Sequence, residues 1–113
     1  MQRARIDPSA GHALDVDPIP GLPALAEAVT ALRAPEEVTR FLRDLCTLPE
    51  LEALAHRWQI VLLLEQGVPY VEIARRVPTS TATVTRVAQW LRHGTGGYGI
   101  ALERLHRRER ARR

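Results

Sequence analysis

A single proline, Pro78, limits the fold more than any other residue, because it lies between two segments with helical patterns. The stretch that contains it, from Val71 to Gly94, reads VEIARRVPTSTATVTRVAQWLRHG. Proline lacks a backbone N–H and disfavours helical geometry at the residue before it, so one helix must end near Val77. Ser or Thr in the cluster that follows is a favoured N-cap. We therefore predict a short helix over 70–77, a turn at Pro78, and a second helix over 81–93.

The inward-facing residues of these two helices are typical of a helix-turn-helix unit over 70–93. Apolar or small side chains fall where two steeply crossed helices need contact, and the small Ala74 would leave room for a close crossing. These residues are Ile73, Ala74, Val77, Val84 and Val87. The alternative that the spacing leaves open is an ordinary pair of helices in a small bundle.

The second helix carries an outward face suited to the DNA major groove. Thr81, Thr85 and Gln89 follow one another at intervals of four residues, with Ala82 beside them. Short Thr and Ala side chains can approach base edges and thymine methyl groups, and glutamine can pair with adenine. Nearby arginines and Ser80 would contact phosphates, which position a protein on the duplex. The predicted DNA-binding residues are Arg75, Arg76, Ser80, Thr81, Ala82, Thr85, Gln89 and Arg92.

The rest of the chain is also predicted to be helical, which gives an all-α fold. Apolar residues make up 45% of the sequence but aromatic residues only 4%, a composition with few strand formers. Thr47 and Glu50 have the spacing of a capping box for a helix over about 49–66, and Gly67 suits its end. That central helix is apolar over so much of its circumference that we expect a partner subunit to cover it.

Charge and composition define three segments. The net charge is +3. We predict a flexible N-terminal arm over 1–20, a helical domain over 21–102, and an Arg-rich tail over 103–113. The tail is either a solvated helix or an arm that grips phosphates or RNA. The single Cys46 and the lack of a long apolar run predict a cytoplasmic protein without a membrane span.

We predict neither an enzyme nor a metal site. The four histidines have no ligand spacing with one another or with Cys46. No Ser, His and Asp arrangement indicates a nucleophile. The segment GTGGYG, at 94–99, follows a helix instead of a strand, so we interpret it as a flexible break before the last helix and not as a phosphate loop.

Several segments resemble the tryptophan repressor family over about 47–102. They include ELEALAHRWQIVLLLEQG and STATVTR, while FLRDLCT, STATVTRV and GTGGYGIAL are closer to a branch of uncharacterised bacterial paralogues. The resemblance implies a small helical bundle that forms an intertwined homodimer. Its two helix-turn-helix units would enter successive major grooves of a palindromic operator in double-stranded DNA, about 34 Å apart.

The resemblance also implies positions for an effector pocket between the central helix and the second helix of the unit. They are Thr47, Arg57, Thr83, Arg86, Val87 and Trp90. The family has a glycine where this chain has Val87, and a serine where it has Trp90. Either the Trp90 indole fills the space that free tryptophan takes in the family, or Trp90 is a core residue. We expect no cofactor, and tryptophan is not expected as a corepressor.

Taken together, the sequence predicts a homodimeric, sequence-specific DNA-binding transcriptional regulator, with repression as its expected action. The alternative is a helical dimer whose two-helix unit binds a protein partner instead of DNA. Binding to duplex DNA that depends on salt concentration would distinguish the two.

Overall fold

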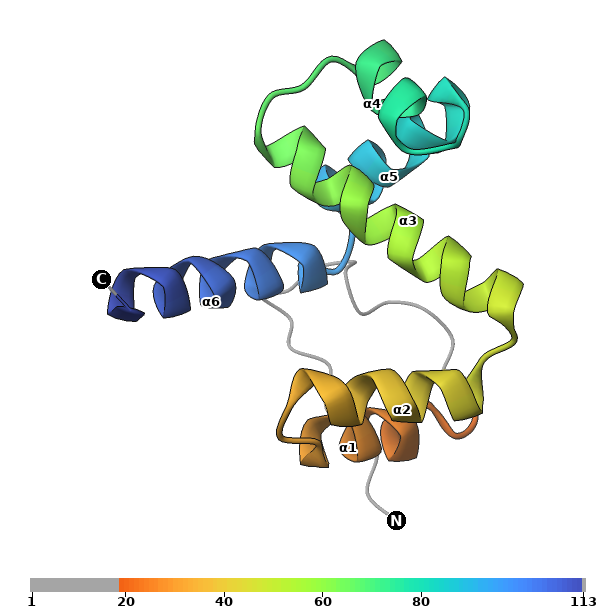
Figure 1. Cartoon of the computed structure of the whole chain (residues 1–113), viewed down its shortest axis with the longest axis vertical. Coiled ribbons are helices and arrows are strands. Elements are labelled where there is room, and N and C mark those ends of the chain that lie inside the picture. The colour runs from red at the N-terminus through yellow and green to blue at the C-terminus, as the bar shows by residue number, and fades with distance from the viewer. Residues whose placement is uncertain (1–18, 113) are drawn as a thin grey trace. The chain divides into compact units, whose positions relative to one another are not determined.

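The computed structural model describes residues 19–112, and all regular secondary structure in this range is helical (Figure 1). The helices are α1 (Leu22–Ala31), α2 (Pro35–Leu45), α3 (Leu48–Glu65), α4 (Tyr70–Arg76), α5 (Thr81–His93) and α6 (Gly97–Arg112). The predicted all-α fold class is confirmed. The chain divides within α3 into two compact units, one ending at His56 and the other starting at Arg57. The predicted arm over 1–20 lies almost entirely outside the described residues.

Helices α1 and α2 are short, and each has a proline in its first turn: Pro23 at the second position of α1 and Pro35 at the first position of α2. Proline suits this place because the N–H that it lacks would have no partner within the helix. Glu36 and Glu37 follow in the first turn of α2, and the Glu37 carboxylate accepts a bond of 2.7 Å from the Arg33 backbone N–H. No residue of α1 or α2 is fully buried. This helix pair therefore has no closed core within the single described chain.

The predicted capping box is present at the start of α3. The Thr47 backbone N–H donates to Glu50 Oε1 at 2.8 Å, and the Glu50 backbone N–H donates to Thr47 Oγ1 at 3.2 Å. The two residues thus satisfy each other's free donors. The bond from the Thr47 N–H, followed by that from its hydroxyl, lowers the pKa of Glu50 below its ordinary value of 4.5.

This capping interaction predicts a pH dependence of stability. Because the pKa of Glu50 is lower in the folded protein than in the unfolded chain, its contribution is present above the unfolded pKa and is lost as pH falls through the folded pKa. In the acid range, the melting temperature of Glu50→Gln should therefore fall less steeply with decreasing pH than that of the wild-type protein. The measurement is a series of thermal melts followed by circular dichroism at stepped pH.

The control for this experiment is Glu52→Gln, which removes one charge from the same helix outside the capping box. Wild-type protein and the control should lose stability more steeply than Glu50→Gln over the acid range. If Glu50→Gln and Glu52→Gln gave the same slope, the capping carboxylate would not be the titrating group.

The end of α3 is closed by Gly67, as predicted. Its φ of 80° lies in the left-handed region that favours glycine. The Val68 N–H donates to the Leu63 carbonyl at 3.1 Å, and the Gly67 N–H donates to the Leu64 carbonyl at 3.0 Å. This pair of bonds is a Schellman motif. It directs the chain from α3 into α4.

The core lies in the unit that begins at Arg57, where the second half of α3 packs with α4, α5 and α6. Its buried side chains are Ile60, Val61, Ile73, Val77, Val84, Val87 and Leu102. The Trp58 ring on α3 and the Tyr98 ring on α6 have centroids 6.2 Å apart. His106 Nε2 lies 3.0 Å from Glu65 Oε2, which gives α6 a polar contact with α3 beside this aromatic one.

Helix α6 differs from the sequence prediction in two ways. The predicted flexible break over 94–99 is wrong for its second half, because Gly97 and the next two residues form the first turn of α6. Burial of Leu102 and the packing of Tyr98 on Trp58 outweigh the low helix propensity of glycine. The predicted tail boundary at 103 also falls inside this helix. Residues 103–112 are exposed, and Arg107 Nη2 lies 3.4 Å from Glu103 Oε2.

Across residues 19–112, no helix combines the length and apolar character that crossing a bilayer requires.

Candidate nucleic-acid interface

Helices α4 and α5 form the helix-turn-helix unit that the sequence predicts. Helix α4 ends at Arg76, and Val77 has extended backbone angles (φ −104°, ψ 119°) directly before Pro78. The two helices pack on each other through buried valines and Ile73, with Ala74 partly buried at the crossing. Figure 1 shows α4 and α5 on one side of the second half of α3. The unit is therefore held by the core and is not a mobile loop.

Ser80 is the N-cap of α5. Its Oγ accepts a bond of 3.1 Å from the Thr83 backbone N–H, and the hydroxyls of Ser80 and Thr83 are 3.2 Å apart. A Ser cap satisfies one of the donors left free at the start of a helix. Both residues therefore have a structural role in fixing the start of α5. Contact of Ser80 with phosphate stays a prediction, as does contact of Thr83 with an effector.

The predicted reading face of α5 is open to solvent. Thr81, Ala82, Thr85 and Gln89 are exposed, while Val84, Val87 and Ala88 are buried on the other side of the helix. Helix α5 contains no acidic residue, so no carboxylate on this helix would meet the phosphates of a bound duplex. The structure thus brings the four predicted base-reading residues together on one surface, which we call the reading face.

Two predicted phosphate contacts, Arg75 and Arg76, share one acidic partner within α4. Arg75 Nη2 lies 2.5 Å from Glu72 Oε2, and Arg76 Nε lies 2.8 Å from the same oxygen. Bonds from Arg75 and then Arg76 lower the pKa of Glu72, and the Glu72 carboxylate raises the pKa of Arg75. In this cluster one half-buried carboxylate holds two exposed guanidinium groups beside the turn.

Sequence reasoning did not identify Glu72 as part of the site. The signal was present, because Glu72 precedes the two arginines by three and four residues, the spacing of neighbours on a helix surface. Its carboxylate offsets part of the positive charge of α4. The electrostatic attraction of this helix for phosphate is therefore smaller than its two arginines alone would give.

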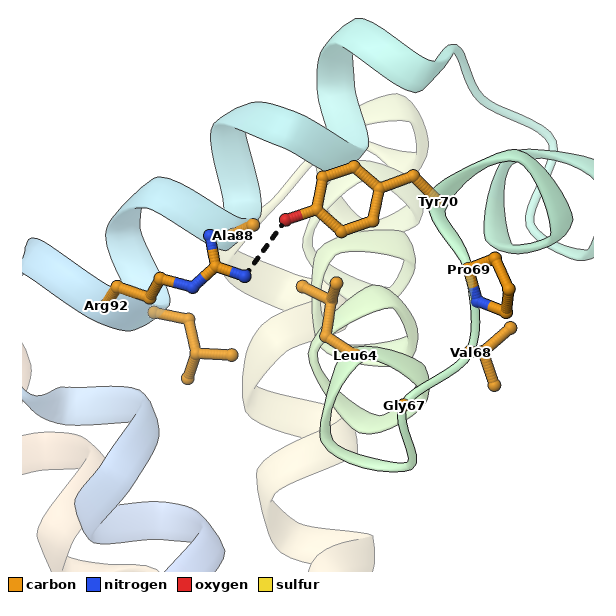
Figure 2. Close-up of a pocket in the computed structure, with 8 residues that line it drawn as sticks. Leu64, Gly67, Val68, Pro69, Tyr70, Ala88 and Arg92 are labelled. Atoms are coloured by element: carbon orange, nitrogen blue, oxygen red, sulfur yellow. Dashed lines mark hydrogen bonds between the residues drawn. The ribbon is translucent and has the colours of Figure 1, made fainter.

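Arg92, the remaining predicted phosphate contact, lies at the other end of the unit. Its Nη2 donates to the Tyr70 hydroxyl oxygen at 3.2 Å and so links α5 to the start of α4 (Figure 2). The pair borders a pocket of about 390 Å³. The pocket is lined by Leu64, Gly67, Val68, Pro69, Tyr70, Ala88, Leu91 and Arg92. Tyr70 was missed from the sequence, since nothing in the local pattern shows which side chain of α4 meets Arg92.

The six effector-pocket positions are split between the two units. Thr47 belongs to the unit that ends at His56, and its hydroxyl accepts the capping bond of α3. Arg57 and Arg86 are exposed, Thr83 is partly buried, and Val87 is buried. Assembly of these residues into one pocket stays a prediction.

Trp90 is not a core residue of the described chain. Its side chain is 59% exposed. The inward stripe of α5 is made by Val84, Val87, Ala88 and Leu91, and Trp90 lies outside this stripe. The ring lies against Gly94, where an added Cβ would come within 2.9 Å of the indole Cε3. The core interpretation is therefore wrong for this chain, and occupation of the effector space by the indole stays a prediction.

Among the residues that the structure describes, no group of three or more His, Cys, Asp or Glu side chains could hold a metal ion.

Comparison with known proteins places this geometry in a family. The Trp repressor protein family matches residues 21–106. The chain is 35% identical over 98 residues to the uncharacterized protein YerC of Bacillus subtilis (strain 168), covering 85% of this chain and 94% of YerC.

Two solved structures are also similar. One is a TrpR-like protein from Eubacterium eligens ATCC 27750, with a TM-score of 0.72, 32% identity, and coverage of 76% of this chain and 89% of that chain. The other is a candidate Trp repressor from Staphylococcus aureus, with a TM-score of 0.71, 35% identity, and coverage of 76% and 86%. These matches confirm the resemblance on which the sequence prediction rested, and the chain belongs to the Trp repressor family.

Proposed function

We propose that this protein is a sequence-specific DNA-binding transcriptional regulator that acts as a repressor. The observation that carries the proposal is the reading face: four exposed, uncharged side chains on a helix that buried residues hold against α4. A rigid helix with short side chains can enter the major groove and bring Thr, Ala and Gln to base edges. The Trp repressor family is one of regulators, which agrees with this proposal.

We further propose that the protein binds DNA as a homodimer. Leu48 and Leu54 of α3 are 63% and 42% exposed in the single chain, and α1 and α2 contain no fully buried residue. A second copy would cover this apolar surface and gain the free energy of its burial. Two symmetry-related reading faces would then fit a palindromic operator.

We also propose that the protein acts without a cofactor. Val87 replaces the family's glycine and is buried, while Trp90 replaces its serine with a far larger side chain. Both changes reduce the space for a free indole, so tryptophan is not the expected corepressor. A regulator that binds DNA acts where the DNA is, so we propose a cytoplasmic location, in keeping with the free thiol of Cys46.

Arg92→Ala tests the phosphate contacts of this proposal. We expect weaker binding to all duplex sequences alike. The salt slope of binding should fall by about one for each half-site, and so by about two for the dimer, because each lost phosphate contact releases about one counterion fewer. The measurement is fluorescence anisotropy on a selected and a random duplex over a range of salt. An unchanged slope would show that Arg92 does not neutralise a phosphate.

The alternative function, binding of a protein partner through the two-helix unit, has one observation in its favour. Trp90 and Val71 are large apolar side chains exposed on this unit, and tryptophan is enriched at the energetic centres of protein interfaces. This alternative predicts that the protein does not bind duplex DNA at any salt concentration. Salt-dependent binding to any duplex would contradict it.

A further inference from the structure

Tyr70 and Arg92 form a polar edge on an otherwise mostly apolar pocket. In Figure 2 the two side chains point toward one another, Tyr70 from α4 and Arg92 from α5. Leu64 separates this pair from the turn at Gly67. Arg92 Nη2 donates to the Tyr70 oxygen, so the hydroxyl proton of Tyr70 is left to donate elsewhere. The guanidinium has further N–H donors beyond the one that this bond uses. Two adjacent groups therefore present donors to the same place.

Charge favours an anion as the group that accepts these bonds. None of the described residues that line the pocket is acidic, and the partner of Arg92 in this bond is a neutral hydroxyl. This differs from Arg75 and Arg76, whose charge Glu72 partly offsets. An oxyanion would accept charge-assisted bonds from Arg92 and one bond from Tyr70, and such bonds are the stronger kind in proteins.

The position of the pair indicates which anion it would meet. Arg92 is one turn beyond Gln89, so it continues the exposed side of α5 toward the end of the helix. A duplex whose major groove receives the reading face has its phosphates at the edges of that groove. The pair bridges the two helices of the unit and would contact such a phosphate from both.

We propose that Tyr70 and Arg92 together bind one backbone phosphate of the duplex, and that the Tyr70 hydroxyl is a further DNA-contacting group. This inference rests on the proposed function. Tyr70 would both donate a bond to the phosphate and hold the Arg92 guanidinium in place before binding. The bond between the two side chains thus reduces the ordering that a free arginine must undergo when it binds.

A double-mutant cycle tests the proposal with wild-type protein, Tyr70→Phe, Arg92→Ala and the double variant. Tyr70→Phe keeps the ring and removes only the hydroxyl, so it should weaken binding to selected and random duplexes alike by roughly 2- to 10-fold. It should leave the salt slope unchanged, because tyrosine is neutral. In the Arg92→Ala background the same change should weaken binding by a clearly smaller factor, since the pair acts as a unit.

A second measurement locates the phosphate. Single backbone phosphates of the selected duplex are replaced in turn by neutral methylphosphonate. At one position in each half-site, wild-type protein should lose the most affinity, Tyr70→Phe should lose less because Arg92 still contacts that phosphate, and the double variant should lose little. Tyr98→Phe, which removes a hydroxyl from α6, is the matched control and should bind as wild type. Circular dichroism melts establish that each variant is folded.

The outcomes separate failure of this inference from failure of the proposed function. If wild-type protein prefers one sequence and Tyr70→Phe binds as tightly as wild type, the phosphate site is overturned and the regulator function stands. Equal losses in both backgrounds would overturn the joint action of the pair. A loss on the selected duplex alone would mean that Tyr70 contributes to sequence reading instead of phosphate contact. If wild-type protein bound no duplex, both proposals would fall together.

Discussion

Replacing Thr85 by glutamate is expected to abolish sequence-specific DNA binding while the protein stays folded and dimeric. Thr85 lies at the middle of the reading face and is exposed, so the change should cost little stability. In the complex, the new carboxylate would face base-edge acceptors and nearby phosphates. Like charges opposed across an interface cost several kcal/mol, which corresponds to a loss of at least about 100-fold in affinity.

The measurement is anisotropy on a selected duplex, with light scattering after gel filtration to follow the oligomeric state. Thr95→Glu is the matched control, because it adds the same charge at an exposed position beyond the end of α5. The control should retain sequence preference and lose only a little overall affinity. Specific binding that survived Thr85→Glu would show that this face of α5 does not enter the groove.

Ile73→Ala is expected to destabilise the helix-turn-helix unit by about 2–5 kcal/mol. Ile73 is 0% exposed and lies in the core cluster where α4 meets α5. Truncation would leave a cavity at this crossing, and small domains are stable by only about 5–15 kcal/mol. Urea unfolding followed by circular dichroism measures the change, and DNA affinity should fall with it because the position of α5 depends on this contact.

Val71→Ala is the control for the core substitution. Val71 is on the same helix but is 73% exposed, so its truncation should change the free energy of unfolding by no more than about 0.5 kcal/mol. Equal effects of the two substitutions would contradict the assignment of Ile73 to the core. A stable Ile73→Ala protein with normal DNA binding would show that α5 is positioned by other contacts.

Features governed by local rules could be predicted from the sequence. Pro78 ends α4 because of its own covalent geometry, Gly67 takes the positive φ that closes α3, and Thr47 pairs with Glu50 across one turn. The reading face also followed from local spacing, since residues four apart share one side of a helix. Its exposure is confirmed, while its contacts with DNA remain to be measured.

Features that depend on tertiary packing could not be predicted in the same way. The bond between Tyr70 and Arg92 joins side chains 22 positions apart, and no local pattern pairs them. Trp90 was a candidate core residue as the alternative to filling the effector space, but the buried stripe of α5 passes beside it. The GTGGYG segment contains poor helix formers, yet packing of Tyr98 on Trp58 draws its second half into α6.

The most direct test of the proposed function is selection from a random duplex library at near-physiological salt, with and without tryptophan. The reading face and the proposed dimer predict enrichment of a palindrome whose half-sites lie about one helical turn apart. Because Val87 and Trp90 reduce the effector space, the same palindrome should emerge in both conditions. Enrichment of no sequence in either condition would contradict the proposal that this protein reads DNA.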